Sequence, residues 1–137
     1  MPYELKESPE TVQLSVSAPN REELFQAVLT GVLAATYGEP LPEGTSEGRV
    51  VPVQAAGDDD VVLLAGLVGE ALRAIREEQG TILPPRWLAF DVNRVTANLP
   101  LHPQKFSARR LEGCSTRVES GGKEWTAWLE FLPRTTA

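Results

Sequence analysis

Apolar and polar residues alternate near the N-terminus and then change to a helical spacing. From Val12 to Ala18 every second residue is apolar, and this period of two predicts a half-buried strand. Asn20 and Glu23 follow at the spacing of a capping box, in which side chains bond the free amides of a first helical turn. Apolar residues then recur every three or four positions until Gly38, a residue that often ends helices. The pattern therefore predicts a strand over 12–18 and a helix from Asn20 to Gly38.

The next segment begins with loop-forming residues and ends in a short apolar run. Proline and glycine predict a surface loop over 38–48, and 50–55 is expected to form a second strand. Pro52 places this strand at a sheet edge, because proline has no N–H to donate to a neighbouring strand.

A second helix is expected after this strand. The aspartates at 58–60 supply the negative charge that stabilises a helix start, and Gly80 is expected to end the helix. Gly66 and Gly69 each cost about 1 kcal/mol in a helix interior, so we expect another backbone to pack closely against them. The predicted buried face comprises Val61, Leu64, Leu67, Val68, Ala71, Leu72 and Ile75.

The rest of the chain predicts strands. Segments 87–92 and 95–99 are expected to form a hairpin through Asn93-Arg94, followed by a proline-flanked loop over 100–104. Two more strands are expected at about 106–118 and 124–132, joined through Ser120-Gly121-Gly122. In the last strand Trp128 lies on the face opposite Trp125, either as an exposed contact residue or under a second packed layer.

Strand, helix, strand, helix and then a run of strands is the order typical of an α+β fold. We therefore predict one domain over 1–137, with two main helices packed near one antiparallel or mixed sheet. No internal repeat or linker interrupts the chain.

The composition and charge of the chain limit the classes of partner that we expect it to bind. The chain of 137 residues is 42% hydrophobic and 23% charged, values typical of a folded domain. Its formal charge of -6 disfavours direct binding to nucleic acid or anionic lipid. Arg86 and the Arg109-Arg110 pair are too scattered for a basic track, so we expect them to be solvated surface. With one cysteine, no leader-like N-terminus and no apolar run long enough to span a bilayer, the expected location is the cytoplasm.

Catalytic groups are sparse. His102 is the single histidine and is expected in a solvent-exposed loop, and Cys114 is the single cysteine and is expected to be a packing residue. No glycine-rich segment has the lysine and hydroxyl residue of a phosphate-binding loop, and the spacing of the aspartates at 58–60 does not match a calcium loop. The residues alone therefore indicate a binding domain without catalytic machinery.

Three segments resemble the archease family. They are Tyr3-Glu4-Leu5 with 12–18 and the Arg21-Glu22-Glu23-Leu24-Phe25 helix start; Val53-Gln54-Ala55 with the following acidic helix; and Gly121-Gly122 with 125–131. The resemblance implies the same α+β fold. It also implies a divalent-metal-binding accessory protein of the GTP-dependent tRNA-splicing ligase.

The metal-binding positions implied by the resemblance are changed. The family's His-Thr-Ala-Asp motif falls directly after Glu7, with Ser8 at the histidine and Thr11 at the aspartate. Two further family aspartates fall at Gly38 and at about Leu132, and a Tyr-His pair falls near Gly113-Cys114. We therefore expect that no metal cofactor is bound.

We expect a non-enzymatic archease-like accessory protein that binds a protein partner, such as an RNA ligase of tRNA splicing or RNA repair. Two alternatives stay open. One is a calcium-, magnesium- or manganese-binding archease that uses the shifted carboxylates Glu10, Glu39 and Glu130. The other is a small enzyme of unknown reaction, which rests on His102 and Cys114. The sequence leaves the oligomeric state open.

Overall fold

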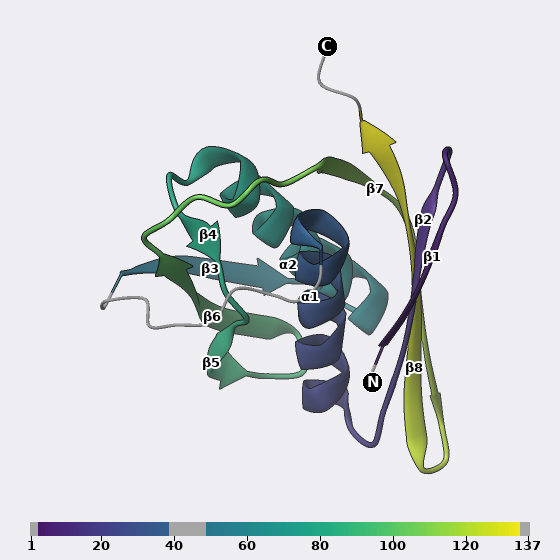
Figure 1. Ribbon diagram of the computed structural model, residues 1–137. Coiled ribbons are helices and arrows are strands. Elements are labelled where there is room, and N and C mark those ends of the chain that lie inside the picture. Colours follow the sequence, from purple (N-terminus) through teal and green to yellow (C-terminus); the bar gives the residue numbers. More distant parts are fainter. Residues whose placement is uncertain (1–2, 39–48, 135–137) are drawn as a thin grey trace.

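Two helices lie between two antiparallel sheets, in three layers (Figure 1). The computed structural model describes residues 3–38 and 49–134, so most of the loop expected over 38–48, including Glu39, lies outside the described residues. This arrangement confirms the α+β prediction, but the helices fill the space between two sheets instead of packing near one. The elements are β1 (Tyr3–Glu7), β2 (Val12–Ala18), α1 (Arg21–Tyr37), β3 (Val50–Ala56), α2 (Asp60–Glu77), β4 (Thr81–Ile82), β5 (Arg86–Phe90), β6 (Arg94–His102), β7 (Arg110–Gly121) and β8 (Glu124–Arg134).

The first sheet has the strand order β1-β2-β8-β7 and joins the two ends of the chain. Strand β2 has the predicted bounds, and its apolar residues pair in register with the buried face of β8, for example Val16 with Ala127. Gln13, Ser15 and Ser17 lie on the opposite face of β2, as the alternation predicts. Strand β1 was not predicted as a separate strand, because its five residues are too few for a periodic signal.

Helix α1 has the predicted caps and is buried on almost every side. The Asn20 side chain accepts a hydrogen bond from the Glu23 N–H at 2.8 Å, and Gly38 has a φ of 89°. Leu24, Phe25 and Val28 have no measurable solvent exposure. Residues of both sheets and both helices form one hydrophobic core.

The second sheet has the order β3-β6-β4, with β5 also paired to β6. Strand β3 lies at its edge, as Pro52 predicts. Strand β6 is longer than expected: it continues through Pro100 and Leu101 to His102, within the segment predicted to be a loop. Pro100 has no N–H to donate, but it lies opposite Val50 at the end of the β3–β6 pairing, and its carbonyl oxygen accepts the Leu83 N–H at 2.9 Å.

Helix α2 begins as predicted but ends earlier. Asp59 caps its first turn by accepting the Val62 N–H at 2.9 Å, and Glu78, instead of Gly80, follows the last helical turn. Gly80 is needed elsewhere, because a Cβ at this residue would lie 2.2 Å from the His102 carbonyl oxygen. None of the described helices is long and apolar enough to cross a membrane.

The helix glycines differ in what surrounds them. A Cβ at Gly66 would meet the Ala55 Cβ at 3.3 Å, as expected for close packing against a neighbouring strand. A Cβ at Gly69 would meet nothing within 4 Å, so the expected close neighbour is wrong at this residue.

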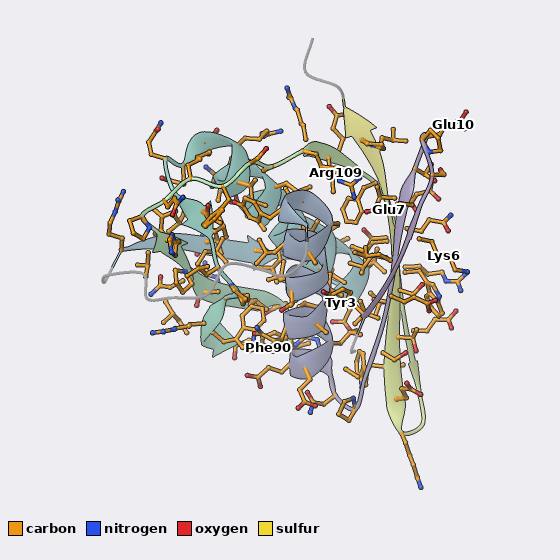
Figure 2. All side chains as sticks on the ribbon, in the orientation of Figure 1. Tyr3, Lys6, Glu7, Glu10, Phe90 and Arg109 are labelled. Carbon is orange, nitrogen blue, oxygen red and sulfur yellow. The ribbon has the colours of Figure 1, made fainter. Side chains whose placement is uncertain are left out.

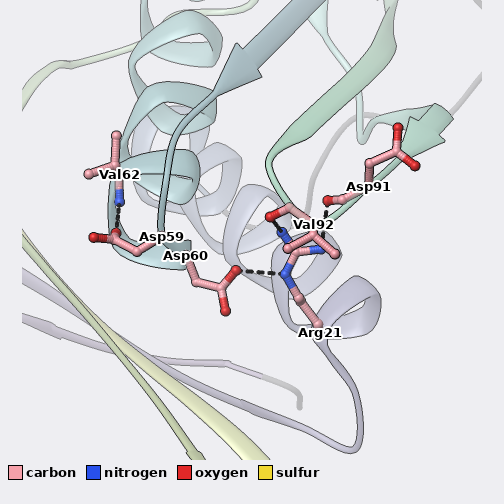
Figure 3. Close-up of polar contacts among 6 residues, drawn as sticks. All are labelled: Arg21, Asp59, Asp60, Val62, Asp91 and Val92. Atoms are coloured by element: carbon pink, nitrogen blue, oxygen red, sulfur yellow. Dashed lines mark hydrogen bonds and ion pairs between the residues drawn. The ribbon is translucent and has the colours of Figure 1, made fainter.

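The Arg21 side chain joins three elements at the start of α1 (Figure 3). Its Nε donates to Asp60 Oδ1 at 2.7 Å, at the first turn of α2. Its terminal nitrogens donate to the carbonyl oxygens of Asp91 and Val92, at 2.9 and 3.0 Å, in the turn between β5 and β6. The guanidinium also lies over the ring of Phe90, 4.7 Å from its centroid.

Two cations of the segment between β6 and β7 bind the C-terminal ends of the helices. Lys105 Nζ donates to the carbonyl oxygens of Ile75, at 3.2 Å, and of Glu78, at the end of α2. Arg109 Nε donates to the Ala35 carbonyl oxygen at 2.6 Å, near the end of α1. Helix C-termini attract cations because their last carbonyl groups lack intrahelical partners.

Tyr37 provides a pH-dependent prediction. Burial raises the pKa of its phenol above 10.0, and the Ile82 N–H, which donates to Oη at 3.1 Å, offsets this in part. Because the folded-state pKa is raised, the contribution of the neutral phenol is complete below about pH 10 and is lost as pH rises through the folded-state value.

We therefore expect Tyr37→Phe to lower the free energy of unfolding by about 1 kcal/mol at pH 7, because the Ile82 N–H loses its acceptor. Above pH 10 the variant should lose less stability with each pH step than the parent. Urea denaturation from pH 7 to 11 measures both effects. Equal pH dependence in the two proteins would contradict the assignment.

Candidate functional site

The structure brings three of the metal positions implied by the archease resemblance together at one end of the first sheet. Ser8 Oγ lies 3.2 Å from Thr11 Oγ1, and the Ser8 N–H donates to the Thr11 carbonyl oxygen at 2.9 Å. Thr11 and Leu132 both adjoin the Val12–Phe131 pair, so they are neighbours across β2 and β8. Gly38, the fourth position, lies at the end of α1.

Arg109 connects these two parts of the molecule. Its guanidinium forms an ion pair with Glu7, the residue before Ser8, and Figure 2 shows the two side chains pointing toward each other. Its backbone N–H donates to the Thr36 carbonyl oxygen at 3.0 Å, two residues before Gly38. The prediction that Arg109 is merely solvated surface is therefore wrong, whereas Arg110 is exposed as expected.

The donor groups at this end do not fit a divalent cation. Hydroxyl, glycine and leucine residues occupy the four expected positions, and Glu7 is paired with a guanidinium instead of being open to a metal. Glu10 is exposed at the tip of the β1–β2 turn (Figure 2), and Glu130 accepts a hydrogen bond from the Gln13 amide at 3.4 Å on the outer sheet face. Across the described residues, no three His, Cys, Asp or Glu side chains gather to hold a metal.

The two candidate catalytic residues, His102 and Cys114, lie on consecutive strands that belong to different sheets. His102 is the last residue of β6 and is half-buried, which corrects the expected exposed loop. Its Nδ1 accepts the Gln104 N–H at 3.1 Å, and its ring lies 5.5 Å from that of Phe106. This hydrogen bond ties the His102 side chain to the backbone of the segment that follows β6. Cys114 is the extra residue of a bulge in β7, and its side chain lies outside the described part of the protein.

A groove on the outer face of the first sheet is a candidate binding site. We call it the outer groove; its volume is about 500 Å³. Small side chains on β2 and β7 leave this space beside the large indole of Trp128, which stands between them on β8. The lining residues are Gln13, Leu14, Ser15, Ser115, Thr116, Arg117, Trp128, Leu129 and Glu130.

The polar groups of the outer groove have mixed charge. The Arg117 guanidinium lies over the Trp128 ring, 4.2 Å from its centroid, and Arg117 Nε lies 3.7 Å from Glu119 Oε1. Glu130 supplies a carboxylate on the other side of Trp128. Half-exposed tryptophan beside arginine is a combination that often supplies much of the binding energy at protein interfaces. The outer groove therefore offers a partner an aromatic ring for stacking and charged groups for hydrogen bonds and ion pairs.

The sequence left Trp128 open, either as an exposed contact residue or under a second packed layer, and the structure leaves it half-exposed on the outer face. Its position on the outer face follows from alternation along β8, and Arg117 comes from the other strand of the same hairpin, whereas Ser15 comes from a strand distant in sequence. No protein-family model and no curated protein matches this sequence. The archease resemblance therefore stays a prediction.

Proposed function

We propose that this protein is a non-enzymatic archease-like accessory protein that acts by binding a partner protein, a GTP-dependent RNA ligase. The outer groove carries the proposal, because the stacked Trp128 and Arg117 side chains line a groove that is open to solvent. The acidic charge of -6 also favours a protein over a direct nucleic-acid ligand.

The metal centre is replaced in this proposal. Arg109 supplies a fixed positive charge between Glu7 and the end of α1, where a divalent cation would be repelled by the guanidinium. The partner is therefore expected to bind without calcium, magnesium or manganese. The proposal leaves to the ligase the chemistry of RNA joining.

The test uses the purified protein and the GTP-dependent RNA ligase of the same cell. We expect the two to co-elute in chelator, and we expect the protein to accelerate ligase guanylylation. Trp128→Ala should weaken the complex by roughly tenfold or more, as truncation of a central interface tryptophan does. Thr126→Ala is the matched control, since it lies on the same face of β8 but does not line the outer groove.

Failure of the wild-type protein to bind or stimulate the ligase would overturn the accessory role. Calorimetric titration separates the metal-binding alternative. Millimolar or tighter binding of a divalent cation that is lost in Glu10→Gln would favour that alternative.

A further inference from the structure

The edge of β7 that faces away from β8 points to an additional interface. Strand β7 is twelve residues long and ends the order β1-β2-β8-β7. Within residues 3–38 and 49–134, β8 is its one partner strand. Its other edge presents backbone N–H and C=O groups that can pair with an added strand.

The outer-face side chains of β7 have a self-complementary charge order. Arg110 and Glu112 precede the bulge, Arg117 and Glu119 follow it, and Ser115 is central. The extra bulge residue shifts the alternation, so that all five residues pair with outer-face residues of β8. Read forward the row is Arg, Glu, Ser, Arg, Glu; read backward it is Glu, Arg, Ser, Glu, Arg. Each charge therefore meets an opposite charge in an antiparallel second copy.

We propose that two copies of this chain pair antiparallel through β7, around a two-fold axis at Ser115, and form one continuous sheet. Arg110 then lies opposite the partner's Glu119, and Glu112 lies opposite the partner's Arg117. On the inner face Leu111 meets the partner's Val118, so apolar residues face apolar residues. This symmetry gives every cross-strand contact twice.

A groove between α2 and β7 supports the same occupant. Its volume is about 440 Å³, and its walls include Val61, Ala65, Gly69 and Leu72 of α2. A two-fold axis perpendicular to the sheet keeps both α2 helices on one face, beside the paired strands. The open space at Gly69, a residue that costs about 1 kcal/mol in a helix, then accommodates the partner's helix.

Charge reversal at position 110 or 119 tests the proposal on the protein alone. Its result is therefore separate from that of the ligase experiment. Light scattering after size-exclusion chromatography distinguishes the 14.9 kDa chain from a mass twice as large. We expect the wild type to dimerise. Arg110→Glu and Glu119→Arg should each weaken dimerisation roughly 10- to 100-fold, because two attractive cross-strand pairs become repulsive. An equimolar mixture of the two variants should restore the dimer, since each opposite charge is then regained.

Arg86→Glu controls for net charge, because Arg86 is an exposed strand arginine of the other sheet. It should dimerise as the wild type does. Restoration in the mixture also shows that both charge variants are folded. A monomeric wild type would overturn the proposal and leave the β7 edge to an extended segment of another protein. A dimer that both variants retain, or variants that fail to associate when mixed, would equally overturn it.

Discussion

Arg21→Ala is expected to lower the free energy of unfolding by about 2–4 kcal/mol. The substitution removes a guanidinium that holds α1 to the first turn of α2 and to the β5–β6 turn. It leaves the Asp60 carboxylate, whose side chain is 29% exposed, without its ion-pair partner. It also leaves the carbonyl oxygens of Asp91 and Val92 without the donors that Arg21 supplies.

Urea denaturation of Arg21→Ala and Arg73→Ala provides the comparison. Arg73 also pairs with two carboxylates, Glu70 and Glu77, but within one helix and with 45% of its side chain exposed. Exposed pairs of this kind contribute about 0.3–0.5 kcal/mol each, so Arg73→Ala should cost less than 1 kcal/mol. Similar losses in the two variants would show that Arg21 does not join the three elements energetically.

Arg21 also shows why local signals predict helices better than their assembly. The Asn20 and Asp59 caps and the Gly38 end are encoded within a few residues of each helix, and the structure has them where the sequence predicts. The hydrogen-bond partners of Arg21 are separated from it by 39 positions in one case and by 70 or more in the others. No spacing in the sequence marks them. The division into two sheets has the same cause, because strand neighbours such as β2 and β8 are chosen by the folded core.

The surroundings of a candidate site were predictable to different degrees. Alternation along β8 places Trp128 on the outer face, because side-chain direction in a strand depends only on sequence position. Arg109 was missed, since its partners Glu7 and the end of α1 lie in other parts of the chain. The same limit applies to Gly80, which looked like a helix end because glycine is common there, although the helix ends before it.

Gly80→Ala is expected to cost about 3 kcal/mol, a large effect for one added methyl group. Its Cβ would lie 2.2 Å from the His102 carbonyl oxygen and within 3.0 Å of two Leu101 side-chain atoms. A flexible side chain can move away, but the carbonyl oxygen belongs to His102 of β6, which pairs with Thr81 of β4. The strand must shift, so overpacking and weakened pairing act together.

Gly69→Ala is the matched control and is expected to have the opposite sign. It also replaces a glycine without a positive φ, but a Cβ at Gly69 meets no atom within 4 Å. The higher helix propensity of alanine should therefore raise the free energy of unfolding by about 0.5–1 kcal/mol. Both variants are measured by urea denaturation at a concentration at which light scattering shows the monomer, because Gly69 lies at the proposed β7 interface and association would alter the comparison. If Gly80→Ala were as stable as Gly69→Ala, the β4–β6 edge would have to be free to move, and the close approach of residue 80 to β6 would not constrain the fold.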